Sequence, residues 1–277
     1  MRPARLLLVA ILIAVAAVRA PAAAPQPPAP AQTADTDVYE KFRAWLGSQP
    51  REAQEHDPLE AYRKVLTAAG VPAAEVERQL RVIDQRGQRL EIDRWNRILT
   101  SPKPGFNVKP NAFLVEMVRG VTPGQALDVG MGQGRNAIYL AQQGWTLTGF
   151  DPADQAVAAA RQAAKSSGVT LTTYVLRDDE FDFGRDKWDL IVLSYVGARG
   201  LIPKLYDSLK PGGRVVTEAF HRDATKAGPI GGQVVYDDNE LLKLFDRFRI
   251  VRYEDTEGMS DFGLRTTRLV RLCAQKP

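Results

Sequence analysis

Apolar residues in the C-terminal part of the chain, from about residue 120 to 277, form short runs separated by segments of helical periodicity. A short apolar run bounded by turn residues is typical of a buried strand, whereas apolar residues three and four apart are typical of a helix that packs on a sheet. Seven strands are expected, at 125–129, 146–151, 170–175, 188–195, from about 214, 249–253 and 267–272. No helical pattern separates the last two strands, so they are expected to form an antiparallel hairpin. The pattern predicts an α/β core with a doubly wound, mostly parallel sheet.

The segment before this core, residues 36–119, has the spacing of amphipathic helices. Helices are expected at about 38–46, from 58, from 72 and at 112–118. Gly87 is expected to interrupt the third of them. Two interpretations stay open: the helices only pack on the sheet, or the loop at 106–111 and its helix form a lid over a ligand site. A Pro/Ala-rich, extended linker is expected at 23–35.

Residues 1–22 have the layout of a secretory signal peptide. Arg2 and Arg5 form a short positive region, an unbroken apolar run of thirteen residues follows, and Ala20-Pro21-Ala22 offers a cleavage site. The apolar run is short for a transmembrane helix, which needs about 20 residues. An uncleaved membrane anchor is therefore the second interpretation, and a misassigned start codon with a cytoplasmic product is the third.

Composition excludes several classes of site and partner. Cys273 is the only cysteine, and the two histidines, His56 and His221, lie far apart, so neither a disulfide nor a metal-ligand cluster is expected. The net charge of +4 falls to near +1 if cleavage removes the three arginines of the first 22 residues. That balance is too weak to favour nucleic acid or an anionic membrane surface as a partner.

The strongest chemical signal is the stretch Asp128-Val129-Gly130-Met131-Gly132-Gln133-Gly134, between an expected strand and an expected helix. Glycines at alternate positions permit the positive φ angles of a tight turn and let a ligand approach the backbone. The N–H groups at the start of the following helix can bind polar or anionic ligand atoms. The stretch fits the patterns G-x-G-x-x-A and D-x-G-x-G-x-G, and an ordinary tight turn is a third interpretation.

Asp151 ends the second expected strand, about twenty residues after the first glycines. A carboxylate at this place can accept hydrogen bonds from the two ribose hydroxyls of an adenosine ligand. Both glycine patterns are compatible with such an acid, so Asp151 predicts adenosine binding without choosing a cofactor. Pro152 is a typical first-turn residue, so Asp151 also fits the role of a helix cap.

Further motifs follow in a fixed order: the acidic pair Asp178-Asp179, W-D-L-I-V at 188–192 and L-K-P-G-G at 209–213. With the glycine stretch, Asp151 and the terminal hairpin, they make residues from about 106 to 277 resemble the class I S-adenosylmethionine-dependent methyltransferases. That family implies a Rossmann-like sheet of seven strands whose last strand is reversed, whereas a dinucleotide-binding sheet ends in a parallel strand. The form L-D-V-G-M-G-Q-G-R-N-A is similar to small-molecule methyltransferases of the tellurite-resistance and thiopurine type.

The resemblance implies S-adenosylmethionine as cofactor. The glycines would cradle its methionine part and the first aspartate would orient its amino group, directly or through water. The acid after the second strand would hold the ribose, and an acid after the third would bind the adenine amino group. The residues implied are Asp128, Gly130, Gly132, Gly134, Asp151 and either Asp178 or Asp179.

No motif that positions a nucleophile is evident. The Asn-Pro-Pro-Tyr type, which in this family marks methylation of a base or amide nitrogen, is absent after the fourth strand. A small-molecule acceptor is therefore expected, and nucleic acid is not. Tyr195, Glu218 and His221 follow strands four and five, where ligands bind. Tyr195 and His221 are weak catalytic candidates, and His221 also fits a surface or helix-cap position.

The predicted export signal conflicts with this function, because S-adenosylmethionine is a cytoplasmic metabolite. Three hypotheses follow. The chain is a small-molecule methyltransferase; or it is an exported, catalytically inactive binding module on a methyltransferase scaffold; or, from G-x-G-x-x-A, it is an NAD-dependent oxidoreductase.

Overall fold

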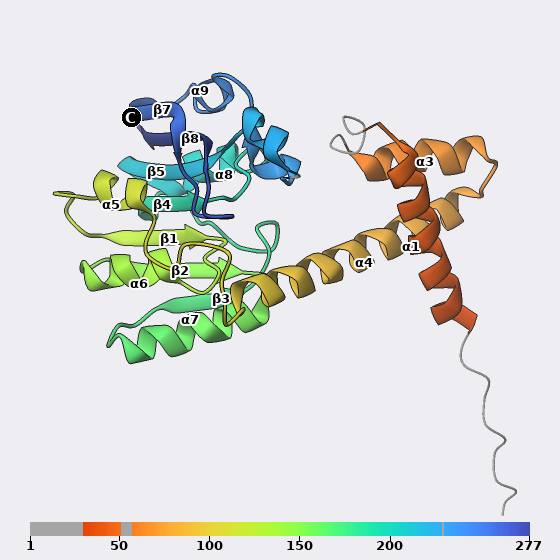
Figure 1. Cartoon of the computed structure of the whole chain (residues 1–277), viewed down its shortest axis with the longest axis horizontal. Coiled ribbons are helices and arrows are strands. Elements are labelled where there is room, and N and C mark those ends of the chain that lie inside the picture. The colour runs from red at the N-terminus through yellow and green to blue at the C-terminus, as the bar shows by residue number, and fades with distance from the viewer. Residues whose placement is uncertain (1–29, 51–56, 229) are drawn as a thin grey trace, which may run out of the picture.

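The computed structural model describes residues 30–50, 57–228 and 230–277, with side chains from residue 35 (Figure 1). The predicted signal peptide at 1–22 lies outside these residues. Within the described part of the chain, no helix is both long and apolar enough to cross a membrane.

The centre of the fold is a mixed sheet in which the strands lie in the order β3-β2-β1-β4-β5-β8-β7. The strands are β1 Gln125–Val129, β2 Thr146–Asp151, β3 Thr172–Val175, β4 Trp188–Ser194, β5 Leu209–His221, β7 Arg249–Met259 and β8 Thr266–Gln275. A two-residue strand, β6 (Val235–Tyr236), pairs with the end of β5. Strands β1 to β5 are parallel, and β8 runs antiparallel to both β5 and β7. The predicted α/β sheet with a reversed last strand is confirmed.

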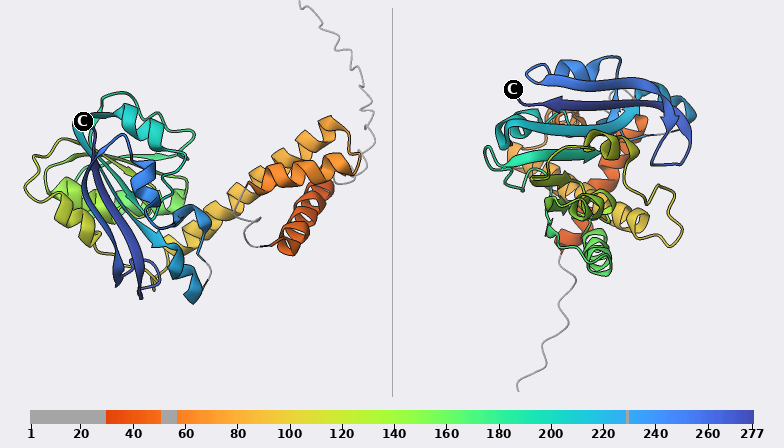
Figure 2. Two further views of the ribbon diagram at one scale, coloured as in Figure 1. Left: turned by 90° about the horizontal axis from the view of Figure 1, so that it is seen from above. Right: turned by 90° about the vertical axis from the view of Figure 1, so that its left-hand side faces the viewer.

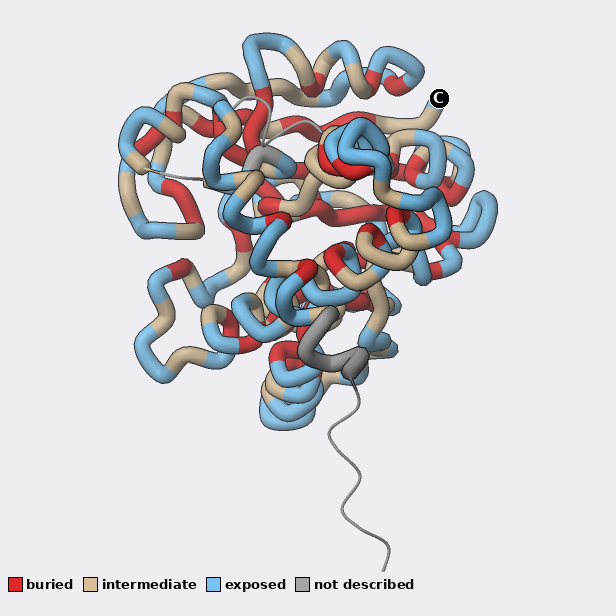
Figure 3. Tube along the Cα trace, turned by 90° about the vertical axis from the view of Figure 1, so that its right-hand side faces the viewer, coloured by how far each residue is buried: buried red, intermediate tan, exposed pale blue. Residues whose placement is uncertain are grey.

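Helices cover both faces of this sheet. On one face α5 (Ala112–Met117) and α6 (Arg135–Gln142) bury Phe113, Leu114 and Leu140 against β1 and β4, and α7 (Asp154–Ser166) lies beside α6. On the other face α8 (Ile202–Ser208) and α9 (Glu240–Leu244) bury Leu205 and Leu241. The 3-10 turns η1 (Arg222–Ala227) and η2 (Gly232–Val234) follow β5. Buried positions run through the strands, while loops and outer helical turns are mainly exposed (Figure 3).

The N-terminal helices form a second, smaller cluster beside the sheet (Figures 1 and 2). Helices α1 (Pro30–Ser48), α3 (Pro58–Ala68) and α4 (Ala73–Leu99) share a core of Phe42, Tyr62, Leu66, Leu80 and Ile83. The predicted linker at 23–35 is wrong over its last residues, because helix α1 begins at Pro30. Proline fits the first turn of a helix, where a backbone N–H would have no hydrogen-bond partner within the helix.

Helix α4 is continuous for 27 residues and about 40 Å, and it joins the helical cluster to the sheet. The predicted interruption at Gly87 is wrong. One glycine costs a helix only about 1 kcal/mol relative to alanine, and both ends of α4 are anchored by packing.

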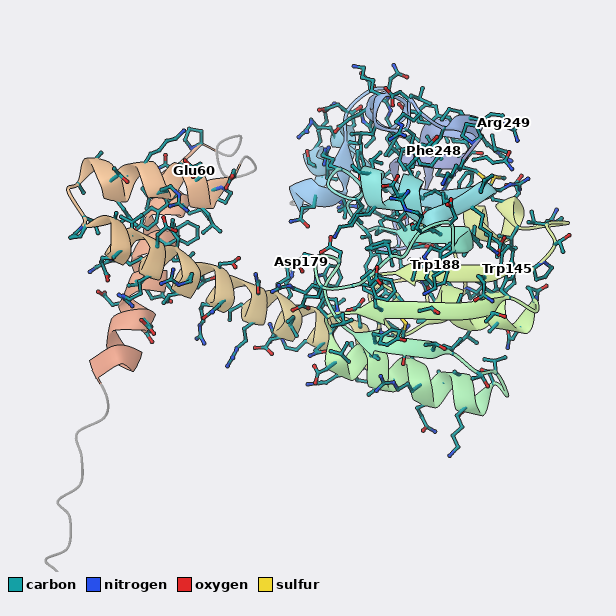
Figure 4. All side chains as sticks on the ribbon, turned by 180° about the vertical axis from the view of Figure 1, so that it is seen from behind. Glu60, Trp145, Asp179, Trp188, Phe248 and Arg249 are labelled. Atoms are coloured by element: carbon teal, nitrogen blue, oxygen red, sulfur yellow. The ribbon has the colours of Figure 1, made fainter. Side chains whose placement is uncertain are left out.

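The carboxyl end of α4 is attached to the start of α7. Asn96 is buried, and its Nδ2 donates to Asp154 Oδ1 at 2.7 Å, while its Oδ1 accepts from the Gln155 amide at 3.0 Å. Figure 4 shows that Asp179, after β3, lies at the end of the sheet where α4 arrives, whereas Trp145, before β2, lies at the opposite end. Helix α4 therefore reaches the edge at which the parallel strands end.

Candidate functional site

The glycine stretch forms the predicted turn between β1 and α6. Gly130, Gly132 and Gly134 have φ angles of +63°, +54° and +81°, which side-chain-bearing residues rarely adopt. The Met131 amide donates to the Phe150 carbonyl at 3.0 Å, which fixes the turn to β2. The turn lies at the carboxyl edge of the parallel strands, where ligands bind in open α/β sheets.

Asp128, at the end of β1, is 2% exposed, and its Oδ2 has no hydrogen-bond partner among the described residues. Burial raises the pKa of Asp128 to about 7; Arg135 and the Ala137 amide oppose this rise, and Asp151 adds to it. A buried carboxylate oxygen without a donor is costly. Asp128 Oδ2 therefore lacks a hydrogen-bond donor, and the ammonium group of a ligand could supply one.

Asp151, at the end of β2, is buried and bound by the turn. Its Oδ2 accepts from the Gly132 amide at 2.9 Å and its Oδ1 from the Ala153 amide at 2.8 Å. Burial raises the pKa of Asp151, although both amide hydrogen bonds favour the charged form. Asp151 is not the helix cap, because α7 begins at Asp154 and its N-cap residue is Ala153, which has no side-chain cap hydrogen bond. Each carboxylate oxygen of Asp151 keeps a second lone pair with which it can accept a ribose hydroxyl.

An apolar cover lies over the glycine turn; it consists of Leu99, Phe106 and Phe262. A Cβ placed on Gly132 would lie 3.3 Å from Leu99 Cδ2. The Phe106 and Phe262 rings are stacked, with centroids 5.3 Å apart. The loop at 106–111 therefore lies over the strand ends, as the lid interpretation requires, whereas α5 packs on the sheet face.

A second side chain lies against the turn. Val196 follows β4, and a Cβ on Gly130 would come within 2.6 Å of its Cγ2. In the part of the chain that is described, Leu99 and Val196 thus take up space beside the glycines. Neither Gly130 nor Gly132 therefore has free room for a side chain on this side.

Of the two acidic residues after β3, the Asp179 carboxylate is bound by an arginine and the Asp178 carboxylate is not. Arg177 donates to Asp179 from Nε at 2.9 Å and from Nη2 at 3.0 Å, and these bonds hold the pKa of Asp179 below its ordinary value. Arg177 also donates to Gln88 of α4. The exposed Asp178 carboxylate makes no hydrogen bond or ion pair with the described residues, although its backbone carbonyl accepts from Lys204 Nζ at 3.0 Å.

A buried polar network lies at the ends of β4 and β5. Glu218 Oε1 accepts from the Tyr195 hydroxyl at 2.7 Å and from Asn111 Nδ2 at 2.8 Å, and its Oε2 accepts from Arg271 Nε at 2.6 Å. Asn111 Nδ2 also donates to Asp261 Oδ2 at 2.8 Å. The network ties the predicted lid loop to the sheet and to the β7–β8 turn.

No local sequence motif predicts that three further residues belong to this site. Arg135, the first residue of α6, forms a buried ion pair with Asp261 at 2.7 Å. Asp261 also accepts from Asn107 Nδ2 at 2.8 Å. Arg271 lies on the reversed strand, and no local motif marks it. The partners are far apart in the chain, so only the fold brings them together.

Tyr195 does not have the properties of a general base. Its φ angle is +58°, it is 7% exposed, and its hydroxyl accepts from the Asp261 amide at 2.9 Å. Burial and the neighbouring Glu218 raise the pKa of Tyr195 well above its ordinary value. The hydroxyl is thus a neutral structural donor to Glu218.

His221 is also engaged, and the structure shows the helix-cap alternative. Its Nδ1 accepts from the Asp223 amide at 3.0 Å, which caps η1, and its Nε2 lies 3.1 Å from Asp238 Oδ1. His221, Asp238 and Asp255 offer ligand atoms within 4.8 Å of one another. Arg268 donates to both carboxylates, at 2.8 Å and 2.6 Å, so a cation already lies in this cluster.

Comparison with known proteins agrees with the geometry of the turn. A family model described as a methyltransferase domain matches residues 126–213. The probable S-adenosyl-L-methionine-dependent methyltransferase TehB of Haemophilus influenzae is 23% identical over 153 residues, which cover 52% of this chain and 53% of that protein. The chain spans about half the length of the curated relatives it matches.

Two solved structures show the same fold. The crystal structure of TehB from Haemophilus influenzae has a TM-score of 0.51 at 18% identity, covering 60% of this chain and 62% of that one. Magnesium protoporphyrin IX methyltransferase from Synechocystis PCC 6803, solved with bound S-adenosylhomocysteine (SAH), has a TM-score of 0.50 at 22% identity, covering 68% and 94%. The reversed β8 agrees with these folds and counts against the NAD-dependent oxidoreductase hypothesis, which required a parallel last strand.

Proposed function

We propose that this chain, which has the class I methyltransferase fold and a methyltransferase domain at residues 126–213, is an S-adenosylmethionine-dependent methyltransferase acting on a small-molecule acceptor. The observation that carries the proposal is the unpartnered, buried Oδ2 of Asp128 beside three glycines with positive φ. An ordinary tight turn needs no such carboxylate, whereas a ligand with an ammonium group does.

The residues present fit the cofactor. Asp128 would accept from its amino group, the backbone at Gly130 and Gly132 would border its methionine part, and Asp151 would accept from its ribose. The Asp179 carboxylate is already bound by Arg177. The Asp178 carboxylate is therefore the one that could accept from the adenine amino group. When bound, S-adenosylmethionine supplies a methyl group on a sulfonium, which is already a good leaving group.

The protein's own contribution is to orient the reactants and to exclude water. Leu99 and Val196, which lie against the glycines, would give way to the cofactor, and Phe106 and Phe262 would shield the site from solvent. Tyr195 and His221 are both engaged in structural hydrogen bonds, so the mechanism uses no base from these two residues. A soft or already ionised acceptor needs none.

Two arguments support a small-molecule acceptor. The segment after β4, Ser194-Tyr195-Val196-Gly197, lacks the motif of base and amide methylation. In the neighbouring polar network Glu218, Asn111 and Tyr195 are buried, and Asn111 of the 106–111 loop bonds Glu218, so the loop covers the Glu218 carboxylate. We further propose that residues 1–22 direct export, as their positive region, apolar run and Ala-Pro-Ala site predict.

The competing hypothesis is an exported binding module that has lost catalysis. The observation that favours it is the position of Leu99 and Val196 against the glycine turn. Calorimetry with S-adenosylmethionine on the chain from Ala23 onward separates the two. We expect binding by the parent and a loss of about tenfold, or 1.4 kcal/mol, in Asp151→Asn, because the ribose loses a charged acceptor.

Asp246→Asn is the matched control, since Asp246 is exposed and far along the chain from the turn. It should bind like the parent. A folded parent that binds no S-adenosylmethionine would refute the methyltransferase proposal and leave the binding module.

A further inference from the structure

We propose that the chain has a second ligand site, for a small amphipathic anion such as an aromatic or acyl carboxylate, on the outer side of the apolar cover. The site is an open hollow with a volume of about 490 Å³. Its lining residues are Arg94, Arg97, Ile98, Ser101, Gly105 and Phe262. The volume lies within the range of small-molecule sites, roughly 300–1,000 Å³. This inference does not depend on methyl transfer.

The hollow carries positive charge that nothing nearby neutralises. Arg94 and Arg97 are exposed, and neither makes an ion pair with a described residue. Asp93, four residues before Arg97 on α4, forms no ion pair with it, and no acidic residue lines the hollow. Glu91, the other nearby acid on α4, accepts from Trp95 Nε1 at 3.0 Å. Two guanidinium groups therefore remain for an anionic ligand, and their planar donors suit a carboxylate or sulfonate.

The apolar side chains of the lining, Ile98 and Phe262, are held in place by packing. The Phe262 ring packs edge-on to Trp95, with centroids 5.9 Å apart, and stacks on Phe106. Ile98 joins the same apolar cluster. The Arg94 guanidinium carbon lies 5.7 Å from the centroid of the Trp95 ring, a cation–π distance. A positive head group thus lies beside a fixed aromatic wall, which matches a ligand with an anionic end and an apolar body.

The hollow is separate from the glycine turn. Ile98 borders it, whereas the next residue, Leu99, faces Gly132. Phe262 has its other contact with Tyr195, whose ring centroid is 5.2 Å away. A ligand in the hollow therefore contacts the apolar cover from outside, and cofactor binding at the turn is not needed to form the site.

A pair of probes tests the proposal on the chain from Ala23 onward. Anilinonaphthalene sulfonate is an amphipathic anion, and N-phenyl-1-naphthylamine is its neutral counterpart. We expect the anionic probe to bind with a fluorescence increase, and Arg94→Gln/Arg97→Gln to weaken it at least tenfold while the neutral probe keeps its affinity. Arg86→Gln/Arg89→Gln, two exposed arginines on the same helix, is the matched control for charge and should leave both probes unchanged.

A second variant adds charge without touching the arginines. Ser101→Glu places an acid in the hollow and should weaken the anionic probe several-fold, whereas Ser101→Gln should not. Melting curves check that each variant is folded. Equal affinity of the anionic probe for the parent and for Arg94→Gln/Arg97→Gln would overturn the proposal. So would an equal loss in the control pair, which would show a general charge effect.

Discussion

Asp128 holds an unfavourable charge in the ligand-free protein, and this makes a prediction about stability. Burial raises its pKa from 3.8 to about 7. A difference of about three pH units corresponds to about 4 kcal/mol at 1.36 kcal/mol per unit. The folded state favours the protonated form, so the stability that this group contributes is present below pH 4 and is lost as pH rises to 7.

Asp128→Asn removes the charge and keeps the shape. We expect the variant to exceed the parent in free energy of unfolding by up to about 4 kcal/mol at pH 8 and by little at pH 4. Denaturant titrations of both proteins at these two pH values measure the difference. Other groups that titrate in this range contribute equally to the stability of both proteins, so their contribution cancels in the difference.

Cofactor binding should be linked to the same proton. The ammonium of S-adenosylmethionine gives Oδ2 a cationic partner and holds the carboxylate ionised, so binding below pH 7 releases a proton. Affinity should then rise by up to tenfold per pH unit between about 5 and 7. Calorimetry at pH 6 in two buffers with different ionisation enthalpies counts the protons released, and Asp128→Asn should release none.

An equal stability difference between Asp128→Asn and the parent at pH 4 and pH 8 would contradict a raised pKa of Asp128. Cofactor binding by the parent at pH 6 without proton release would contradict it as well. Asp246→Asn serves as control here too, because an exposed aspartate should show neither effect.

Two further variants test the cover and the polar network. Leu99→Ala should lose about 2 to 3 kcal/mol of stability and bind S-adenosylmethionine more tightly, because less apolar side chain has to move off the turn. The control Leu80→Ala removes a leucine that is buried in the helical cluster, so it should lose stability without gaining affinity. Thermal melts measure the stability of both variants, and calorimetry measures their affinity. Glu218→Gln should lose about 2 to 4 kcal/mol, because the guanidinium of Arg271 loses its buried partner. Glu257→Gln on the exposed side of β7 should be neutral in the same denaturant titration.

The sheet and the glycine turn could be predicted because their causes are local. Short apolar runs mark strands buried on both faces, and the alternate glycines from Gly130 to Gly134 mark a turn that needs positive φ. The acid at Asp151 could be placed because it ends a strand at a fixed distance from that turn. These features depend on neighbours in the chain, and the sequence shows such neighbours directly.

The rest of the site depends on contacts between distant segments. Glu218 meets Asn111 across 107 residues, and Asn107 meets Asp261 across 154. No local pattern indicates that Leu99 lies against Gly132, because this follows from the direction in which α4 leaves the helical cluster. The same helix continued through Gly87, since packing at its two ends outweighs the small local cost of glycine.

The burial of Asp128 and the apolar cover over the turn have a common consequence for binding. Above pH 7 Asp128 is ionised in the free protein, which therefore already bears the desolvation cost of the carboxylate. When a ligand ammonium binds, only the ammonium still has to be desolvated. Its attraction to the carboxylate is stronger in this buried site than in water. The displacement of Leu99 and Val196 works against this gain. The balance favours a ligand that supplies both a cation for Asp128 and enough apolar surface to replace these two side chains, and an ammonium without an apolar body should bind weakly.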